Sequence, residues 1–392
     1  MPSKTDSSVE KPVLQCGALI FGYTIVRKLG CGGYGAVYEV EKNNVSYAAK
    51  AEIVNKKNEG TLMVEARVLR RLSHSPHACT LSFASKYESD GIELNVIIMT
   101  LLTLPLNKLR RACPEQRFTR STAVRVAIQS LQAIRDLHSI GYLHRDVKAG
   151  NLAMSSDRRV MLIDFGFARR FIDIDDEGRP SMRKPRKRAG FVGTTRYCSK
   201  HVHKRKEQAR RDDLWAWLYM VVEMITGGLP WSDLSDNKMA SYKMEVGSRL
   251  YENCPQEFLF LHDHINSLEY RSKPNYDLLF RWLERIRVRC GILESDPFDW
   301  EKGGRYEEIA EKIEMQRWKD TMKEQKEQGN AVDIPDKVAR WLQNDNMSQS
   351  SGDSEDEEDS SHDVKEDYEK DKLGVTDVVK AKLKEYAKKI KF

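Results

Sequence analysis

The 392-residue sequence predicts an α+β fold of two lobes, a small β-rich lobe with one main helix followed by a larger helical lobe. Three features carry this prediction. Strand-like runs with a glycine turn fill residues 21–53, an amphipathic helix and a buried strand-like run follow, and apolar residues after Thr119 recur at the 3.6-residue period of helices. We therefore expect the first lobe at 21–101 and the second at 102–298.

The first lobe begins with three strand-like runs, FGYTIVRKL, AVYEVEK and SYAAKAEI, of which the first two are joined by a turn made of glycines. We expect them to pair as antiparallel strands. The next run, GTLMVEARVLRRL, places Leu62, Ala66, Leu69 and Leu72 at roughly helical spacing, which predicts an amphipathic helix that carries Glu65. The apolar run LNVIIMTLL then predicts a buried strand that leads into a short extended connector.

The second lobe is predicted to be mainly helical. A long helix is expected after Thr119 because its apolar side chains share one face: Val124, Ala127, Ile128, Leu131, Ile134 and His138. A second helix should begin at the paired acids Asp212 and Asp213, which suit a helix start. We expect Trp215, Trp217 and Trp231 to be core residues.

Both ends of the chain differ in character from the two lobes. Residues 1–20 form an N-terminal tail, and 299–345 are a charged extension with a helix expected from Glu307 to about Gln328. The segment 346–373 contains SQSSGDSEDEEDSSHD, which is too acidic and polar to bury a core, so we expect disorder. Residues 374–392 end in a basic amphipathic pattern that predicts a helix.

Composition limits the cellular setting. Seven scattered cysteines without a CxxC pair argue against a disulfide framework or a zinc site and fit a reducing compartment. The opening residues lack a secretory apolar stretch, and the longest apolar run is interrupted by Glu223. We therefore expect a monomer in the cytoplasm, with the nucleus as a second location, and no membrane partner.

The string LGCGGYGAV lies between two expected strands rather than between a strand and a helix. That context favours a loop covering phosphates over a dinucleotide fold, because glycines let backbone amides approach phosphate oxygens closely. A glycine-rich turn without a ligand is the alternative for this motif alone. We assign nucleotide binding to the whole loop: Leu29, Gly30, Cys31, Gly32, Gly33, Tyr34, Gly35, Ala36 and Val37.

Lys50 lies one strand after the glycine loop, where its ammonium could reach the α and β phosphates while Glu65 on the following helix holds it. A surface lysine and a glutamate on a helix face are the alternative reading of this pair. Its position relative to the glycine loop favours the functional one.

Two further strings supply the remaining chemistry of phosphoryl transfer. In HRDVKAGN, Asp146 can accept a hydrogen bond from an attacking hydroxyl and Asn151 offers an amide oxygen to Mg²⁺. In VMLIDFGFA, Asp164 offers a carboxylate that bridges metal and phosphates. Each acid alone could be an ordinary loop residue, but the ordered set argues against coincidence.

This ordered set resembles the signature motifs of the eukaryotic protein kinases over about residues 20–295, and the resemblance implies their two-lobed fold with ATP and Mg²⁺ as cofactors. Lys148 resembles the serine/threonine branch, and Thr194 in GTTRY matches the threonine that contacts the catalytic aspartate and lysine. The resemblance also implies that Ala48 lies at the ATP site, that Met99 is the gatekeeper, and that the hinge runs from Thr100 to Leu102.

The chain also resembles the casein kinase 1 superfamily. RYCSKHVH stands where most protein kinases have APE, and GTTRY, RRDDLWAWLYMVVEMITGGLPW and KPNYDLL are similar to that superfamily. The basic string RKPRKRAGF looks most like the tau-tubulin kinase branch. Asp213 matches the aspartate that steadies the catalytic loop, with a plain helix-start role as the alternative.

Basic residues concentrate between 183 and 211, where Glu207 is the only acid, so we expect an anion to be recognised there. Arg196 matches the superfamily arginine that contacts an anion beside the activation segment. We hypothesise that Arg196, with Arg186, Lys187 or Arg188, favours acidic or pre-phosphorylated protein substrates. A solvated loop or a nuclear import signal is the alternative.

A second hypothesis concerns the acidic tail. It could be a salt-sensitive autoinhibitor or an autophosphorylation site, and a solvated linker is the alternative.

Two other functional classes compete with a serine/threonine protein kinase. A pseudokinase scaffold would be free to lose catalytic residues, whereas Lys50, Glu65, Asp146, Asn151 and Asp164 are all present. A nucleic-acid-binding protein could use the basic cluster, but the sequence lacks a recognised nucleic-acid module, so a nucleic-acid partner is not expected.

Overall fold

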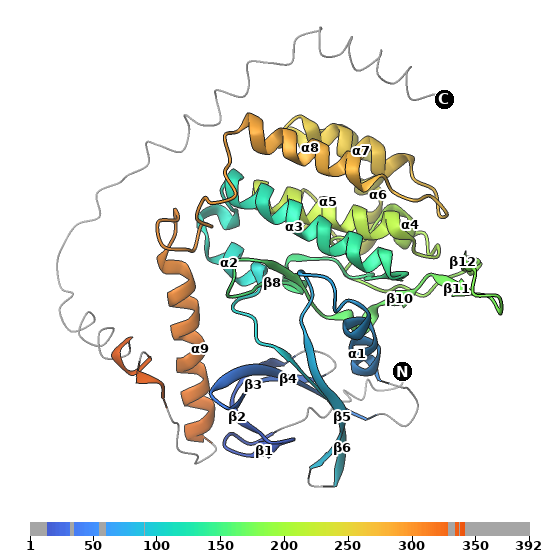
Figure 1. Cartoon of the computed structure of the whole chain (residues 1–392). Coiled ribbons are helices and arrows are strands. Elements are labelled where there is room, and N and C mark those ends of the chain that lie inside the picture. The colour runs from blue at the N-terminus through green and yellow to red at the C-terminus, as the bar shows by residue number, and fades with distance from the viewer. Residues whose placement is uncertain are drawn as a thin grey trace, which may run out of the picture. The chain divides into compact units, whose positions relative to one another are not determined.

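The computed structural model of the chain describes residues 14–31, 35–54, 60–89, 91–327, 334–336 and 338–341. The chain divides into two compact units, Met1–Asp333 and Ile334–Phe392. The second unit is described only at 334–336 and 338–341, so the fold considered below is that of the first unit (Figure 1). Most of the predicted N-terminal tail, the acidic segment 346–373 and the basic helix 374–392 lie outside the described residues.

An antiparallel sheet of six strands forms the small lobe, in the order β1-β2-β3-β4-β6-β5. Its strands are β1 (Leu19–Ile20), β2 (Tyr23–Cys31), β3 (Ala36–Lys42), β4 (Val45–Ile53), β5 (Leu81–Ser89) and β6 (Ile92–Thr100). The three strands predicted from the start of the lobe are β2, β3 and β4, and the predicted buried strand is β6. The edge strand β5 is not among the strands predicted from the sequence.

The helix predicted to carry Glu65 is α1 (Thr61–Arg71), and Leu62, Ala66 and Leu69 on it are buried. Its first turn is held by the carboxylate of Glu52 at the end of β4. Glu52 accepts hydrogen bonds from the backbone N–H of Thr61 (3.1 Å) and of Leu62 (2.9 Å). A carboxylate at this position satisfies the unpaired N–H groups of a helix start and complements the helix dipole. The contact fixes α1, and therefore Glu65, relative to the sheet.

The large lobe is mainly helical, as predicted. Its helices are α2 (Leu106–Ala112), α3 (Arg120–Ser139), α4 (Lys200–His203), α5 (Arg210–Thr226), α6 (Asp236–Glu245), α7 (Glu257–Ser267) and α8 (Tyr276–Arg289). The long predicted helix is α3, and the helix predicted at the paired acids is α5. These two helices pack together at the centre of the lobe, where the Trp217 indole donates a hydrogen bond to Ser130 Oγ (3.0 Å). The three tryptophans predicted to be core residues are all buried.

Further strands, all short, lie before and after the loops that contain HRDVKAGN and DFG. They are β7 (Tyr142–Leu143), β8 (Leu152–Met154), β9 (Val160–Leu162), β10 (Arg169–Arg170), β11 (Ile172–Ile174) and β12 (Pro180–Met182). β8 pairs with β9, β7 with β10 and β11 with β12, all antiparallel. The first two pairs bring the loop that contains HRDVKAGN beside the loop that contains DFG.

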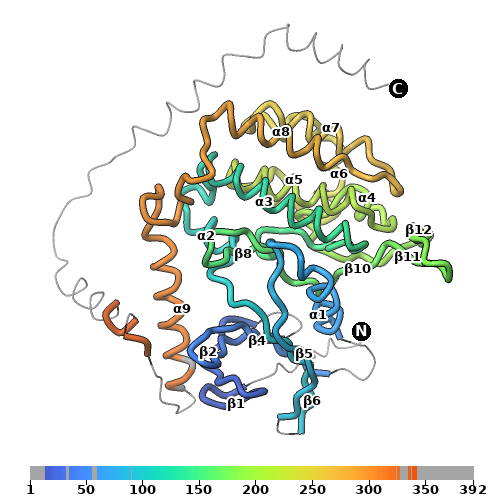
Figure 2. The backbone as a smooth tube through the Cα atoms, viewed as in Figure 1, coloured from blue at the N-terminus to red at the C-terminus, as the bar shows by residue number. Residues whose placement is uncertain are grey.

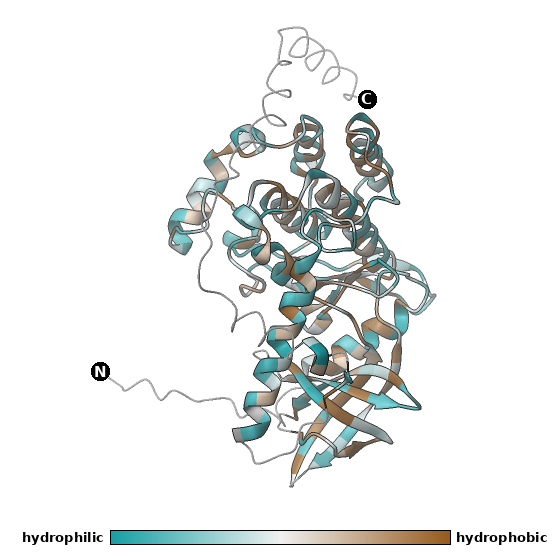
Figure 3. Ribbon diagram, turned by 90° about the vertical axis from the view of Figure 1, so that its left-hand side faces the viewer, coloured by the Kyte–Doolittle hydropathy of each residue, from teal (hydrophilic) through white to brown (hydrophobic). Residues whose placement is uncertain are grey.

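A last helix of the first unit, α9 (Glu308–Glu327), corresponds to the helix expected from Glu307 to Gln328. It contacts α2 of the large lobe and β2 of the small lobe (Figure 2). Figure 3 views the molecule from the α9 side and shows mostly hydrophilic residues along this helix. Among the helices in the described part of the chain, none is long and apolar enough to cross a membrane.

Arg27 on β2 joins the small lobe to α9. Its guanidinium pairs with Glu39 on β3 (2.8 Å) and with Glu314 on α9, and its guanidinium carbon lies 4.1 Å from the ring centroid of Trp318. Arg317 on the same helix donates to the carbonyl of Thr103 in the connector between the lobes (3.4 Å). The helix therefore links the small lobe to the connector.

Candidate active site

The strands on either side of the glycine loop pair with each other, as predicted. β2 and β3 pair as far as Cys31 and Ala36. A Cβ atom on Gly35 would lie 2.0 Å from the carbonyl oxygen of Ala51, so only glycine fits where β3 begins beside β4. Gly32, Gly33 and Tyr34 lie outside the described residues. The flanking members of the predicted loop lie on β2 and β3: Leu29, Gly30, Cys31, Ala36 and Val37.

The residues predicted to contact ATP from the sheet lie on two paired strands. Ala48 on β4 pairs with Met99 on β6, and both are buried. On β4, Lys50 pairs with Val37 of the glycine hairpin. Leu102 is half-buried in the connector that follows β6. The sheet therefore brings Val37, Ala48 and Met99 to the strands around Lys50.

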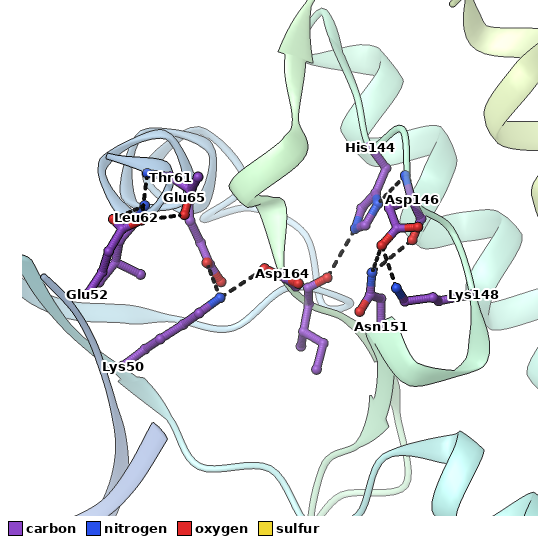
Figure 4. Close-up of polar contacts among 11 residues, drawn as sticks. Lys50, Glu52, Thr61, Leu62, Glu65, His144, Asp146, Lys148, Asn151 and Asp164 are labelled. Atoms are coloured by element: carbon purple, nitrogen blue, oxygen red, sulfur yellow. Dashed lines mark hydrogen bonds and ion pairs between the residues drawn. The ribbon is translucent and has the colours of Figure 1, made fainter. Parts of the chain in front are cut away.

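Lys50 is held between two carboxylates that come from different parts of the chain (Figure 4). Its Nζ lies 2.6 Å from Glu65 Oε2 on α1 and 2.9 Å from Asp164 Oδ1 after β9. Burial disfavours its positive charge, but the carboxylates of Glu65 and Asp164 outweigh burial and raise the pKa of Lys50. The ammonium therefore stays protonated at neutral pH and is fixed in place.

The two carboxylates differ in environment. Burial raises the pKa of Glu65 above its ordinary value. Burial also acts to raise the pKa of Asp164, but the Lys50 ammonium overcomes it and the pKa of Asp164 is lowered. Asp164 is therefore ionised at neutral pH, as a ligand for a hard cation must be.

The loop after β7 orients Asp146. Its Oδ2 accepts from Lys148 Nζ (2.6 Å), and its Oδ1 accepts from Thr194 Oγ1 (2.7 Å). Lys148 Nζ also donates to Thr194 Oγ1 (3.0 Å), and Asn151 Nδ2 donates to the Asp146 carbonyl (2.8 Å). The four predicted residues thus form one connected cluster (Figure 4 shows Asp146, Lys148 and Asn151).

Buried Asp213 holds the backbone of the catalytic loop, so it does more than begin a helix. It accepts hydrogen bonds from the backbone N–H of His144 and of Arg145, both at 2.8 Å, and from His138 Nε2 at 2.9 Å. Burial opposes its negative charge, but the bonds from His138 and His144 lower the pKa of Asp213. Its neighbour Asp212 makes the helix-start contact instead, accepting from the Ala209 N–H (2.7 Å).

Asn151 and Asp164 fit Mg²⁺ as the cation. Asn151 uses its Nδ2 as a donor to Asp146, which leaves Oδ1 as a possible metal ligand, and Asp164 uses Oδ1 for Lys50, which leaves Oδ2. Within the described residues, no group of three or more His, Cys, Asp or Glu side chains could hold a metal. The donor set therefore suits a hard cation that takes its other ligands from phosphate and water, as Mg²⁺ does.

The residues predicted to bind a substrate anion are not equivalent in the structure. Arg196 pairs with buried Glu223 (3.0 Å), and Arg186 pairs with Glu207 (Nη2 to Oε1, 2.9 Å). Lys187 and Arg188 are exposed. Two of the four basic groups are therefore already neutralised by carboxylates, and the role of all four in substrate binding stays a prediction.

Sequence reasoning missed the residues that hold the activation segment in place of an APE ion pair. Lys243 on α6 donates to the carbonyls of Thr195 (2.7 Å) and Cys198 (2.9 Å), and Ser199 Oγ donates to Asp212 Oδ1 (2.5 Å). Glu223 also accepts from the hydroxyl of Tyr197. A lone acid within the apolar run of α5 was the one available signal, since a buried glutamate needs a partner.

Comparisons with known proteins agree with this geometry. The protein kinase domain family matches residues 23–287. The serine/threonine-protein kinase spe-6 of Caenorhabditis elegans is 30% identical over 74% of this chain and 78% of its own length. A probable casein kinase I homolog of Encephalitozoon cuniculi is 31% identical over 68% of this chain and 85% of its own.

Two further comparisons set the extent of the likeness. A probable serine/threonine-protein kinase of Dictyostelium discoideum is 36% identical over 73% of this chain, which spans only 58% of that protein. The solved structure of vaccinia related kinase 3 has a TM-score of 0.62 at 18% identity, covering 73% of this chain and 94% of that structure, and so shows the shared fold. The chain therefore belongs to the protein kinase domain family and is a serine/threonine protein kinase with casein kinase I proteins among its relatives.

Proposed function

We propose that this kinase transfers the γ-phosphate of ATP, in the presence of Mg²⁺, to serine or threonine hydroxyls of protein substrates. The observation that supports the proposal most is the joint arrangement of two clusters. Lys50 lies between Glu65 and Asp164, and Asp146 lies between Lys148 and Thr194. Phosphoryl transfer depends mainly on positioning and charge neutralisation, and these clusters can supply both.

Asp146 would receive the acceptor hydroxyl. With Lys148 and Thr194 fixing its two oxygens, its carboxylate can accept a hydrogen bond from the hydroxyl and then its proton. The hydroxyl oxygen forms a bond to the γ-phosphorus while the bond to the β,γ-bridging oxygen breaks and ADP leaves. Lys148 lies close enough to Asp146 to offset charge on the transferred group.

Lys50 would bind the α and β phosphates of the nucleotide. Glu65 holds the Lys50 ammonium beside Asp164, where the ammonium could contact a bound phosphate. Bound Mg²⁺ would neutralise phosphate charge, with Asn151 and Asp164 as its protein ligands. A pseudokinase scaffold is not favoured, because every one of these groups is present and paired with its expected neighbour.

Phosphorylation of a degenerate peptide library with labelled ATP tests the proposal. Asp146→Asn keeps the size of the side chain but cannot accept the hydroxyl proton, so we expect a loss of about 10²–10⁴-fold in rate with nucleotide binding retained. Asp233→Asn is the matched control, because Asp233 is exposed and far from the clusters in sequence. Equal rates for the wild-type chain and Asp146→Asn would contradict the proposal.

We also propose a preference for acidic or pre-phosphorylated substrates, supported by the exposed side chains of Lys187 and Arg188. Arg196 and Arg186 support it less, because each already binds a carboxylate. Lys187→Glu/Arg188→Glu should raise KM for acidic peptides and leave KM for neutral peptides unchanged.

Lys238→Glu/Lys302→Glu makes the same change in net charge at exposed positions elsewhere and should have no selective effect. An unchanged peptide preference in Lys187→Glu/Arg188→Glu would contradict the proposed preference for acidic substrates. The basic string that contains these residues is also the ground for proposing the tau-tubulin kinase branch. Location in the cytoplasm or nucleus and a monomeric state stay predictions from the sequence.

A further inference from the structure

A cavity lies in the large lobe, away from the residues of the two catalytic clusters. Its volume is about 440 Å³, and it is bounded by α4, α5, α6, α7 and the 3-10 turn Gly247–Tyr251. No described residue of the glycine loop and no residue of the two catalytic clusters lines it. A volume of this order is typical of sites for small organic ligands.

The lining of the cavity is cationic. Lys200, Lys204 and Lys243 line it, and no aspartate or glutamate does. The ammonium of Lys243 is already bound to the carbonyls of Thr195 and Cys198, and burial lowers the pKa of Lys243 to about 8. Lys200 donates to Asn266 (2.6 Å) and keeps two further N–H donors. A negative charge in the cavity would be stabilised by all three ammonium groups, with Lys200 and Lys204 supplying donors.

The inner wall is aromatic. Trp215 and Tyr219 on α5 lie with their ring centroids 5.4 Å apart, and His262 on α7 packs edge-on against both Trp215 (5.2 Å) and Tyr251 (5.4 Å). These rings offer a flat apolar surface to a ligand body, while Lys200 lies 6.0 Å from the Trp215 ring centroid. The cavity therefore joins an anion-binding end to an aromatic wall.

Trp215 carries an independent sign that the site is incomplete. It is 4% exposed, and its indole N–H has no hydrogen-bond partner among the described residues. A buried donor without a partner is destabilising because its lost hydration is not replaced, so native structures rarely leave one. Trp217 and Trp231 on the same part of the fold both donate to an acceptor. Of these three tryptophans, Trp215 alone lines the cavity, and it is the one whose indole N–H has no acceptor among the described residues.

The geometry points to a binding site for a small organic anion in this cavity, with its carboxylate, phosphate or sulfonate group at Lys200 and Lys204 and an aromatic or other flat apolar body against Trp215, Tyr219 and Tyr251. The site belongs to the large lobe alone. Its occupancy requires no phosphoryl transfer, so the inference is independent of the proposed catalytic function.

Fluorescence titration with 8-anilinonaphthalene-1-sulfonate tests the site, using the full chain with a saturating non-hydrolysable ATP analogue. The sulfonate and rings of this probe match the two ends of the cavity, and we expect saturable binding that the ATP analogue does not displace. N-phenyl-1-naphthylamine, which lacks the sulfonate, should bind about tenfold or more weakly, because it loses the charge-assisted contacts.

Lys200→Gln/Lys204→Gln should weaken binding of the sulfonate probe by about tenfold or more and leave binding of the neutral probe unchanged. Lys206→Gln/Lys238→Gln is the matched control, because these exposed lysines change the net charge equally and do not line the cavity. Thermal unfolding of each variant checks that the fold is retained.

Three results would overturn the inference: displacement of the probe by the ATP analogue, equal affinity for the neutral and anionic probes, or equal loss of affinity in the two double variants.

Discussion

Arg27 and Trp318 join the small lobe to α9, and a double-mutant cycle between them should give a coupling free energy of about 1–2 kcal/mol. The guanidinium carbon of Arg27 lies 4.1 Å from the centroid of the indole ring, and the two residues are 6% and 5% exposed. A cation over an aromatic face contributes about 0.5–1 kcal/mol at an exposed site and about 2 kcal/mol when desolvated. The variants are Arg27→Met, Trp318→Leu and their combination, which keep apolar bulk but remove the charge or the ring.

The single variants should differ in cost. Arg27→Met removes the shared partner of Glu39 and Glu314 as well as the ring contact, so the free energy of unfolding should fall by about 3 kcal/mol. Trp318→Leu should lower it by about 2 kcal/mol through lost packing. The double variant should lose about 1–2 kcal/mol less than the sum, because the contact between the two groups is counted in both singles.

The measurement is urea unfolding of the full chain, monitored by circular dichroism and by tryptophan fluorescence. The two probes must give the same transition for the free energies to be compared. Arg27→Met combined with Trp300→Leu is the control cycle, since Trp300 is also buried but packs on Phe118 and Phe298 in the large lobe. That pair should be additive within about 0.3–0.5 kcal/mol. A coupling energy for Arg27 and Trp318 no larger than that of the control would refute the role assigned to their contact.

Two further predictions concern the catalytic loop and its support. Burial raises the pKa of Asp212 to about 6, above the value of about 3.9 for an unfolded chain, so its contribution to stability is complete below pH ~4 and is lost as the pH rises through 6. Relative to Asp212→Asn, the wild-type chain should lose about 3 kcal/mol of unfolding free energy between pH ~4 and pH ~7, and parallel stability curves would contradict this. Gly193 has a φ of 111°, and a Cβ atom there would lie 2.5 Å from the carbonyl oxygen of Arg145. Gly193→Ala should therefore cost about 1–3 kcal/mol of stability and slow phosphorylation by moving Thr194, whereas Gly228→Ala, where a Cβ atom meets nothing within 4 Å, should do neither.

The catalytic clusters could be predicted because their members are fixed mainly by local sequence. Asp146, Lys148 and Asn151 share one short loop and bond to one another within it. Lys50 and Glu65 lie on a strand and on the helix that follows it, so their meeting needs only the correct packing of α1 on the sheet. In each case the spacing in sequence limits the geometry.

The features that sequence reasoning missed depend on packing between distant segments. The strand β5 is at the edge of its sheet and is partly exposed on both faces, so LSFASKYES shows no clear alternation of apolar and polar residues. Lys243 reaches the carbonyls of Thr195 and Cys198 only because α6 packs beside α4. Nothing in the residues around Lys243 indicates that its ammonium is buried. The cavity beside it combines side chains from four helices and could not be seen in any single segment.

The basic region between 183 and 211 has less unpaired positive charge than its composition suggests, because two carboxylates neutralise arginines within it. Glu207 pairs with Arg186 and also lies 3.3 Å from Arg169, while Glu223 pairs with Arg196 and lies 3.5 Å from Arg110.

Each of these buried carboxylates has two arginine partners, so it neutralises positive charge that the composition alone would leave unpaired. Within the activation segment, Arg186 and Arg196 are therefore already neutralised by carboxylates of the chain itself. An anion that bound Arg196 or Arg186 would have to compete with Glu223 or Glu207, whereas Lys187 and Arg188 are exposed. Charge reversal at those two positions is thus the change that most directly separates substrate recognition from support of the fold.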